Sequence, residues 1–448
     1  MKAPLRPSAA LAALALVASA AACTPDVAND PVPEALEFDT AASPPRAPQP
    51  TGLIVNPITG RIDFGLAGTP LPDDCSRAQS MSAAECQFDH YLETLDGFPS
   101  VSPAAAPATA PIAADTLTAG ENVVAVALRE PGAVPDLVVG FDEASRSVAL
   151  RPLPSWAIGE YYFFGVRAYG GGVRASSGKE VVGSPTMALL KEDSSLTCGA
   201  RSPAAIDPTC PAYELLSQSQ PPADARSNLF TLEVIRQRYI ALGVWQRLAA
   251  AGLPKEETGV AFGFPVHTGS VAELDPSVGL VPRATASNEI RIGVHGPVDA
   301  ATVSAFVVRE QPGSVVVMDL TAAATGDLAL GFPRAEARFT GGVVVISGNA
   351  PFSVGHQYGI FMSNDVHAPD GKPLVPAPIS VLLTLTAPLV DDHGKSQLSS
   401  VSDANAAELE KGRQSLATLF DNPVFGPLTG LSRENLVYCF AFTFQDPS

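Results

Sequence analysis

The sequence predicts a mainly β protein with two tandem antiparallel β-sandwiches, each with one helix inserted before its last strand. Three observations lead to this fold class. A series of short motifs occurs twice in the same order, within residues 111–268 and again within 297–445. Short β-branched or alternating runs follow one another at intervals of about ten residues, which is typical of a sandwich and not of βαβ units. Each half then carries one helical pattern and one closing strand.

The repeated motifs are short but keep their order along the chain. A sequence built from two copies of one unit is more typical of a binding or spacing array than of a single active site. The matched pairs are Pro111–Leu117 with Pro297–Val303, Leu128–Gly132 with Val308–Gly313, Gly159–Tyr162 with Gly355–Tyr358, Gly178-Lys179 with Gly371-Lys372, and Leu232–Arg236 with Leu409–Arg413.

The expected strands are apolar runs bounded by Pro, Gly and Asp. In the first half they are Val123–Leu128, Leu137–Phe141, Val148–Leu150, Tyr161–Val166 and Val260–His267. In the second half they are Ala305–Val308, Val315–Leu320, Val343–Ile346, Tyr358–Met362 and Leu436–Phe444. The last strand carries an aromatic side chain at every second position from Tyr438 to Phe444, so we expect all four on one face.

The expected helices are amphipathic and lie just before the closing strands. Apolar residues recur at three- and four-residue steps over 229–248, with Ser227 as the N-cap, and over 409–420, with Ser402 or Asp403 as the N-cap. The helix motifs of the two halves are 177 residues apart, whereas the preceding Gly-Lys motifs are 193 apart. The first half therefore contains 16 extra residues between its Gly-Lys turn and its helix.

The first 22 residues have the features of an export signal. Lys2 and Arg6 precede a short apolar run, 9–22, which is below the roughly 20 residues needed to span a bilayer. This run ends on Cys23 in a pattern that resembles the lipobox of bacterial lipoproteins, which implies a diacylglycerol on the Cys23 thiol. Ordinary signal-peptidase cleavage nearby, with Cys23 an incidental thiol, is the alternative.

Residues 23–50 are rich in proline and poor in large apolar side chains. Such a segment buries too little surface to offset the entropy of ordering it, so we expect a lipid-anchored, disordered tether. Thr24 stands where an inner-membrane retention signal usually has Asp. The resemblance therefore favours an outer membrane or cell-surface location.

The other five cysteines predict two disulfides and one free thiol. Cys75 and Cys86 lie eleven residues apart, and Cys198 and Cys210 lie twelve apart inside the 16-residue insertion. An exported protein folds in an oxidising compartment, so we expect each pair to form a local disulfide. Zinc is the competing interpretation, but no CxxC pair or histidine cluster accompanies these residues. Cys439 is left over as a buried free thiol.

The charge balance is strongly acidic. Removal of the signal leaves 26 basic against 46 acidic residues. This balance disfavours nucleic acid as a partner, and no basic patch suggests otherwise.

Several segments resemble known envelope proteins. Residues 50–63 and 92–99 are similar to the non-catalytic N-terminal region of bacterial virulence-factor lipases. Residues 364–373, Asn-Asp-Val-His-Ala-Pro-Asp-Gly-Lys-Pro, resemble the strand-turn signature of S-layer-type Ig-like domains. The resemblance implies two tandem Ig-like domains in a bacterial lipoprotein. In the first half, residues 169–178 depart from the Asn-Asp…Asp-Gly pattern.

No motif predicts an active site. The chain lacks the G-x-S-x-G elbow of a lipase, a paired-histidine metal motif and a nucleotide-binding glycine loop. The sequence also ends soon after the expected last strand, so we expect no catalytic domain. Asp365 and Asp370 are a weak candidate for Ca²⁺ ligands. The alternative is a turn in which Asp370-Gly371 sets the backbone.

Together these patterns predict a non-enzymatic, lipid-anchored envelope protein that binds, adheres or spaces, with no cofactor and an unidentified protein or glycan ligand. The alternative is an accessory or detached N-terminal region of an extracellular lipase system. The expected organisation is a signal (1–22), a tether (23–50), a first Ig-like domain with a lead-in and stapled insertion (51–268), a linker (269–283) and a second Ig-like domain (284–448).

Overall fold

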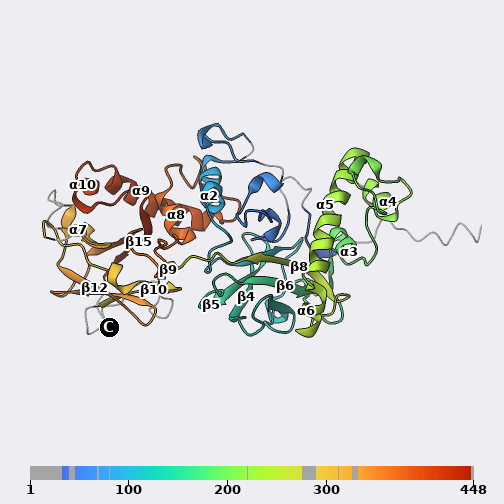
Figure 1. Ribbon diagram of the computed structural model, residues 1–448, viewed down its shortest axis with the longest axis horizontal. Coiled ribbons are helices and arrows are strands. Elements are labelled where there is room, and N and C mark those ends of the chain that lie inside the picture. Colours follow the sequence, from blue (N-terminus) through green and yellow to red (C-terminus); the bar gives the residue numbers. More distant parts are fainter. Residues whose placement is uncertain are drawn as a thin grey trace, which may run out of the picture.

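The computed structural model describes residues 33–39, 46–67, 70–79, 81–218, 220–274, 289–310, 312–324 and 331–444. Helices and strands each account for 28% of the protein. The chain is therefore a mixed α/β protein with several small antiparallel sheets, and the expectation of a mainly β protein is wrong in its helix content. Its two halves lie side by side along the long axis (Figure 1).

The helices and strands follow one another in a similar order in the two halves. The first half contains β1 (Glu34–Leu36), α2 (Ala83–Glu93), β2 (Ala104–Pro107), β3 (Val123–Ala127), β4 (Asp136–Asp142), β5 (Ser147–Leu153), β6 (Tyr161–Arg167), β7 (Val181–Gly183), α3 (Pro185–Leu190), α4 (Pro211–Ser217), α5 (Pro222–Ala241), α6 (Val244–Ala250) and β8 (Thr258–Pro265). The second contains β9 (Val271–Leu274), β10 (Glu289–His295), β11 (Val315–Asp319), α7 (Leu320–Ala323), β12 (Ala335–Thr340), β13 (Val343–Gly348), β14 (Gln357–Ser363), α8 (Pro378–Thr384), α9 (Asp403–Phe420), α10 (Phe425–Thr429) and β15 (Leu436–Thr443).

The two halves have the same strand pairing. The first half forms the sheets β2-β5-β4 and β3-β6-β8, and the second forms β10-β13-β12, extended by β9, and β11-β14-β15. If β1, β7 and β9 are set aside, each half has six strands, which can be numbered 1 to 6 along the chain. In both halves one sheet then has the strand order 1-4-3 and the other the order 2-5-6. The register even shifts at matching places, between Val166 and Arg167 in β6 and between Met362 and Ser363 in β14. The duplication seen in the sequence is therefore a duplication of topology.

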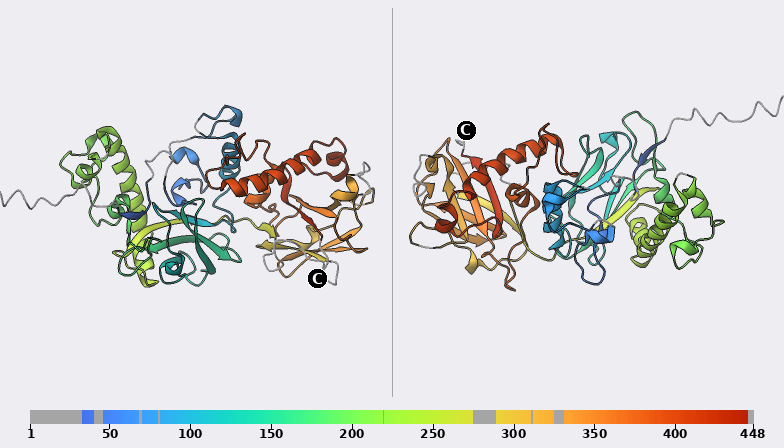
Figure 2. Two further views of the ribbon diagram at one scale, coloured as in Figure 1. Left: turned by 180° about the vertical axis from the view of Figure 1, so that it is seen from behind. Right: turned by 90° about the horizontal axis from the view of Figure 1, so that it is seen from above.

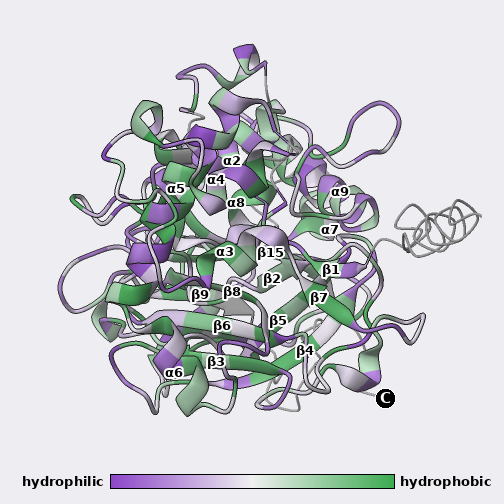
Figure 3. Ribbon diagram, turned by 90° about the vertical axis from the view of Figure 1, so that its right-hand side faces the viewer, coloured by the Kyte–Doolittle hydropathy of each residue, from purple (hydrophilic) through white to green (hydrophobic). Residues whose placement is uncertain are grey.

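In each half the two sheets share one apolar core. Residues from all the sheets' inner faces belong to a single buried cluster in each half. In the first half these include Val148, Leu150, Phe164 and Phe264, and in the second half Ile346, Ile360, Tyr438 and Phe442. Figure 3 shows the hydrophobic colours along the strands and the hydrophilic ones along peripheral loops. The predicted aromatic face of the last strand thus points into the core of the second half.

Helices cover the outer face of one sheet in each half. In the second half Met318, Phe361 and Cys439, from β11, β14 and β15, pack with Leu416 and Phe425 of the helices. Because these strands are covered on both faces, β8 and β14 are buried almost throughout rather than alternating. The layers are visible from two further directions in Figure 2.

The helical layer is larger than predicted. Each half places several helices before its last strand rather than one. A short helix with proline at its first turn, α3 or α8, comes first, and the long helix α5 or α9 follows. The 16-residue insertion of the first half contains α4 together with the disulfide that begins it. The predicted disulfide between Cys198 and Cys210 is present in this segment.

The proline-rich segment is partly folded, which corrects the expectation of a disordered tether over 23–50. Glu34–Leu36 forms β1 and pairs in parallel with β7, and Leu36 and Phe38 are completely buried. These two large apolar side chains belong to the core cluster of the first half, and their burial anchors the strand there. The lipidation site Cys23 lies outside the described residues.

The lead-in, residues 46–98, connects the two halves. Its helix α2 packs Ala84 against Val381 and Leu382 of α8. The Gln87 amide donates to the Thr386 hydroxyl at 2.7 Å, and its carbonyl oxygen accepts from the Thr386 and Ala387 amides. The first residues of the expected linker 269–283 also join the second half, because β9 pairs with β10. Residues 275–283 lie outside the described residues.

Four of the five motif matches correspond in the structure, and one does not. Leu128–Gly132 follows β3, whereas Val308–Gly313 precedes β11, so these segments occupy different positions in the two halves. The similar letters Arg-Glu and Pro-Gly mark turns in both places, which is why the sequence suggested a match. The expected strand Ala305–Val308 is likewise reduced to isolated bridges at Ala305 and Val307.

Candidate functional site

The candidate site is a polar hollow of about 270 Å³ at one end of the second half. We call it the loop-end hollow. It lies where the β10–β11 connection meets the two ends of the β14–β15 connection. Its lining residues are Thr302, Ser304, Pro312, Gly313, Ser314, Ser363, Asp365, Thr429, Gly430 and Leu431. The lining therefore combines hydroxyl groups, one carboxylate and exposed backbone, without a basic side chain.

Local hydrogen bonds fix the hydroxyl groups of the loop-end hollow. Ser314 donates its hydroxyl to the carbonyl oxygen of Thr302 at 2.6 Å and accepts from the Ser304 amide at 3.1 Å. Ser363 donates to a carboxylate oxygen of Asp365 at 2.8 Å. Ser363 and Ser314 are buried, whereas Asp365 is exposed. The Asp365 carboxylate is thus held at the mouth by a buried residue and stays open to a ligand.

The weak calcium candidates are each engaged in separate turns. Asp365 accepts from Ser363, while Asp370 caps its own turn by accepting from the Lys372 amide at 3.1 Å and pairs with the Lys372 ammonium at 3.4 Å. The Lys372 hydrogen bonds hold the pKa of Asp370 below its usual range. Gly371 has a left-handed φ of 81°. These contacts fit the alternative of an Asp-Gly turn.

The predicted disulfides are present. Cys75 bonds to Cys86 at the start of the lead-in helix, and Cys198 bonds to Cys210 in the insertion. Among the described residues, the one group of three side chains able to hold a metal is Cys75, Cys86 and His90. Its two sulfur atoms are already joined to each other. A thiolate is what a zinc site needs, so this group does not serve as one in the oxidised protein.

Cys439 is a free, buried thiol, as predicted. Burial raises its pKa to about 12, and only 1% of the residue is exposed. In a Cys23→Ser chain we expect Ellman's reagent to find no reactive thiol in the folded protein and one equivalent after unfolding in guanidinium. A fast-reacting equivalent in the folded protein would contradict this placement, and a Cys439→Ser chain is the control.

Two aspartate–histidine pairs were missed from the sequence because their partners are far apart in it. Asp96 of the lead-in contacts the His267 imidazole and accepts from the Thr268 amide and hydroxyl at 3.0 and 2.6 Å. Asp319 contacts His356 at 2.7 Å and also caps α7 through the Ala322 amide. Burial would raise the pKa of Asp96, but the hydrogen bonds from His267 and Thr268 outweigh it and lower that pKa. Both aspartates thus fasten chain segments together.

No family model, curated protein or solved structure matches this chain. No helix in the described part of the chain has the length and apolar character needed to cross a membrane.

Proposed function

We propose that the protein is a lipid-anchored, non-enzymatic component of the bacterial cell envelope whose two Ig-like units present a ligand-binding loop end. The observation that carries this proposal is the strand order shared by the two halves. In Ig domains one sheet pairs strands B-E-D and the other C-F-G, which is 1-4-3 and 2-5-6 when six strands are counted from B. Both halves have this pairing.

A second feature of Ig domains supports the same proposal. A tyrosine corner places a tyrosine near the start of strand F, with its hydroxyl bonded to backbone a few residues upstream. In β6 the Tyr162 hydroxyl accepts from the Ala157 amide at 3.0 Å, and in β14 the Tyr358 hydroxyl accepts from the Ser353 amide at 2.8 Å. The two tyrosines are in equivalent positions, five residues after their partners.

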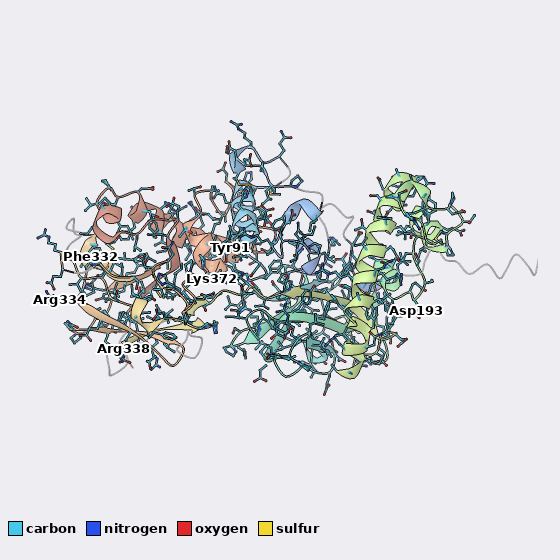
Figure 4. All side chains as sticks on the ribbon, viewed as in Figure 1. Tyr91, Asp193, Phe332, Arg334, Arg338 and Lys372 are labelled. Carbon is cyan, nitrogen blue, oxygen red and sulfur yellow. A yellow bond between two sulfur atoms is a disulfide. The ribbon has the colours of Figure 1, made fainter. Side chains whose placement is uncertain are left out.

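The loop-end hollow is placed as a binding site would be in such a domain. The B–C and F–G loops lie at one end of an Ig sandwich and form much of the binding surface of variable domains. The hollow is lined by the matching connections, β10–β11 and β14–β15. The contact between α2 and α8 suggests a spacing function as well, because it ties the two units together through the lead-in. Tyr91, labelled in Figure 4 where the halves meet, donates to the Pro376 carbonyl at 2.5 Å.

The membrane part of the proposal rests on Cys23. We expect the full chain to enter the detergent phase in Triton X-114 partitioning and a Cys23→Ser chain to move to the aqueous phase, because the diacylglycerol would be lost. A Cys439→Ser chain, which removes a buried thiol, should partition like the parent. If the Cys23→Ser chain partitioned like the parent chain, the proposed lipid anchor at Cys23 would be wrong.

The alternative, an accessory region of an extracellular lipase system, is favoured by the lipase-like segments 50–63 and 92–99. It makes a different prediction. The purified chain should then raise the rate at which a separate lipase of the same cell cleaves an ester, without cleaving it alone. Ester cleavage by the chain alone, above a heat-unfolded control, would overturn both non-enzymatic proposals.

A further inference from the structure

We propose that the loop-end hollow binds a guanidinium group, supplied by an arginine side chain on a protein partner. This inference rests on the proposed function as a binding module and names the ligand chemistry of its site. The evidence is internal to the chain, because the first half fills the equivalent position with an arginine of its own.

The equivalent position is fixed by matching backbone hydrogen bonds. The Arg167 amide donates to the Asn122 carbonyl at 2.8 Å, and the Ser363 amide donates to the Ser314 carbonyl at 2.9 Å. Each of these residues also ends its strand directly after the shared register shift. Ser363 therefore stands where the first half has Arg167.

The next residue confirms this alignment. The Ala168 amide donates to the Glu257 carbonyl at 2.9 Å, and the Asn364 amide donates to the Asn435 carbonyl at 2.7 Å. Glu257 and Asn435 are consequently equivalent as well.

The surroundings of Arg167 show which chemical group fits this position. Its guanidinium donates to the Gly252 carbonyl at 2.6 Å and to the Glu121 carbonyl at 3.4 Å, and it forms an ion pair with Glu257. The side chain is 18% exposed, so its charged group lies in a largely enclosed, acceptor-lined place. This is the geometry that guanidinium, with donors in a planar fork, satisfies well.

The second half keeps the cradle and removes the arginine. Gly252 and Gly430 both have left-handed φ angles, 93° and 75°, and Leu253 and Leu431 after them are both buried. Gly430 and Leu431 line the hollow. A serine side chain has two heavy atoms where arginine has seven, so the space that Arg167 fills in one half is left open in the other.

The negative charge is also retained, at a different residue. Asn435 replaces the carboxylate of Glu257 and donates its amide to the Gly430 carbonyl at 2.8 Å, which leaves that oxygen a second lone pair. Asp365, beside Ser363, supplies a carboxylate instead. The nearby Arg433 is directed elsewhere, to the Thr384 carbonyl and to Asp421. A cation in the hollow would thus meet a carboxylate and a carbonyl, and charge-assisted bonds of this kind are the stronger ones.

The test uses the folded full-length chain with Cys23→Ser and two probes, N-acetyl-arginine amide and its neutral isostere N-acetyl-citrulline amide, titrated by NMR at low salt. We expect the arginine probe to shift the signals of Ser314, Gly430 and Leu431 and the citrulline probe to bind roughly tenfold more weakly, a difference of about 1.4 kcal/mol. Asp365→Asn should weaken the arginine probe to the level of citrulline. Asp370→Asn, which changes a nearby turn carboxylate outside the hollow, is the matched control.

Two reciprocal variants make the test specific. Ser363→Arg should fill the hollow from within and abolish probe binding, whereas Arg167→Ser should open a second site and raise the stoichiometry from one to two. If Ser363→Arg fails to fold, the Asp365→Asn and Arg167→Ser variants are sufficient to test the proposal. Equal binding of both probes, or arginine binding that Asp365→Asn leaves unchanged, would overturn the proposal.

The source of the guanidinium is tested separately. A peptide with one arginine in an extended segment should bind more tightly than the free amide, because a protein partner adds contacts around the mouth. If N-acetyl-arginine amide bound more tightly than the peptide, the proposal of a protein partner would be wrong. If the arginine probe bound but no envelope component did, the guanidinium site would stand and the proposed envelope function would be wrong. Failure of the site and failure of the function therefore give different results.

Discussion

Replacing Arg413 with alanine is expected to destabilise the second half by about 3–5 kcal/mol, the usual effect of leaving a buried charge without its partner. Arg413 and Glu410 lie on α9 and are 9% and 6% exposed. The guanidinium donates two parallel bonds to the Glu410 carboxylate, at 2.8 and 2.7 Å. Without them the carboxylate would stay buried with only neutral donors.

The cost is large because this pair also holds the chain that leads into the helix. Glu410 accepts from the Leu389 amide at 2.8 Å and from the Gln414 amide at 2.8 Å. Arg413 donates to the Leu385 and Thr386 carbonyls at 3.3 and 3.4 Å. The cluster therefore closes the loop between α8 and α9, and its loss would leave several buried polar groups unpaired.

The first half contains the same cluster and provides the matched variant. Glu233 accepts from Arg236 at 2.9 and 2.8 Å, from the Leu196 amide at 2.9 Å and from Gln237 at 2.8 Å, and Arg236 donates to the Glu192 and Asp193 carbonyls. Arg236→Ala should therefore cost about as much as Arg413→Ala. Urea unfolding followed by fluorescence measures both. Losses below about 1 kcal/mol would show that the clusters are not energetically significant.

A double replacement separates the charge from the packing. Glu410→Leu with Arg413→Met should lose much less stability than Arg413→Ala, because no buried charge remains. A double variant as unstable as the single one would indicate that the loop closure, and not the unpaired carboxylate, dominates the loss.

The same clusters predict the response to acid. The Arg413 hydrogen bonds hold the pKa of Glu410 at about 2. Burial raises the pKa of Glu233, but the bonds from Arg236 and Leu196 outweigh it and bring that pKa to about 2. A folded-state pKa below the unfolded value of 4.5 gives stability that is present above pH 4.5 and is lost as pH falls toward 2. Glu-to-Gln variants at both positions should flatten this loss.

The sequence predicted the duplicated organisation because its signals are local. Turn glycines, strand alternation and a helix stripe recur in order, and the motif Leu409–Arg413 turned out to mark the buried cluster. The insertion could be located from spacing alone. Each of these features depends on neighbours within about ten residues, where pattern and structure are closely linked.

The parts that could not be predicted depend on distant partners. The folding of β1 needs β7, about 150 residues away, and a proline-rich composition gave no sign of it. The loop-end hollow combines residues from two connections that are far apart in the sequence, β10–β11 and β14–β15. Its suitability for an arginine side chain becomes apparent only when Ser363 is compared with Arg167, and that comparison requires the register of β6 and β14. The extra helices α6 and α10 are short and derive their stability from the sheets they cover.

Replacing Asp89 with asparagine is expected to stabilise the protein at pH 8 and to have a much smaller stabilising effect at pH 5. Asp89 lies on α2 and is 8% exposed. Burial, together with the carboxylates of Glu85 and Glu93 one turn to either side, raises its pKa from 3.8 to about 8. A raised folded-state pKa means that stability is fully present below pH 3.8 and is lost as pH rises through 8.

The size of the effect is bounded by the pKa shift. The shift corresponds to at most about 5 kcal/mol at pH 8, and penetration of water around the charged form would reduce this, so we expect a gain of about 1–3 kcal/mol for Asp89→Asn. Urea unfolding at pH 5 and pH 8 measures it, with the exposed Asp115→Asn as the control. A destabilised Asp89→Asn chain at pH 8 would mean that the charged carboxylate has a favourable partner.

The stability gained by Asp89→Asn at pH 8 should be concentrated at the contact between the two halves. Asp89 shares α2 with Gln87, which binds Thr386, and with Glu85, which accepts from the Ser399 amide and hydroxyl at 2.6 Å each. Ionisation of Asp89 disfavours the burial of this helix, so hydrogen exchange in α2 and α8 should speed up from pH 6 to pH 8 beyond the intrinsic rate change. In Asp89→Asn that excess should vanish, whereas α5, remote from the contact, should behave alike in both chains. An equal excess in the variant would place the pH sensitivity elsewhere.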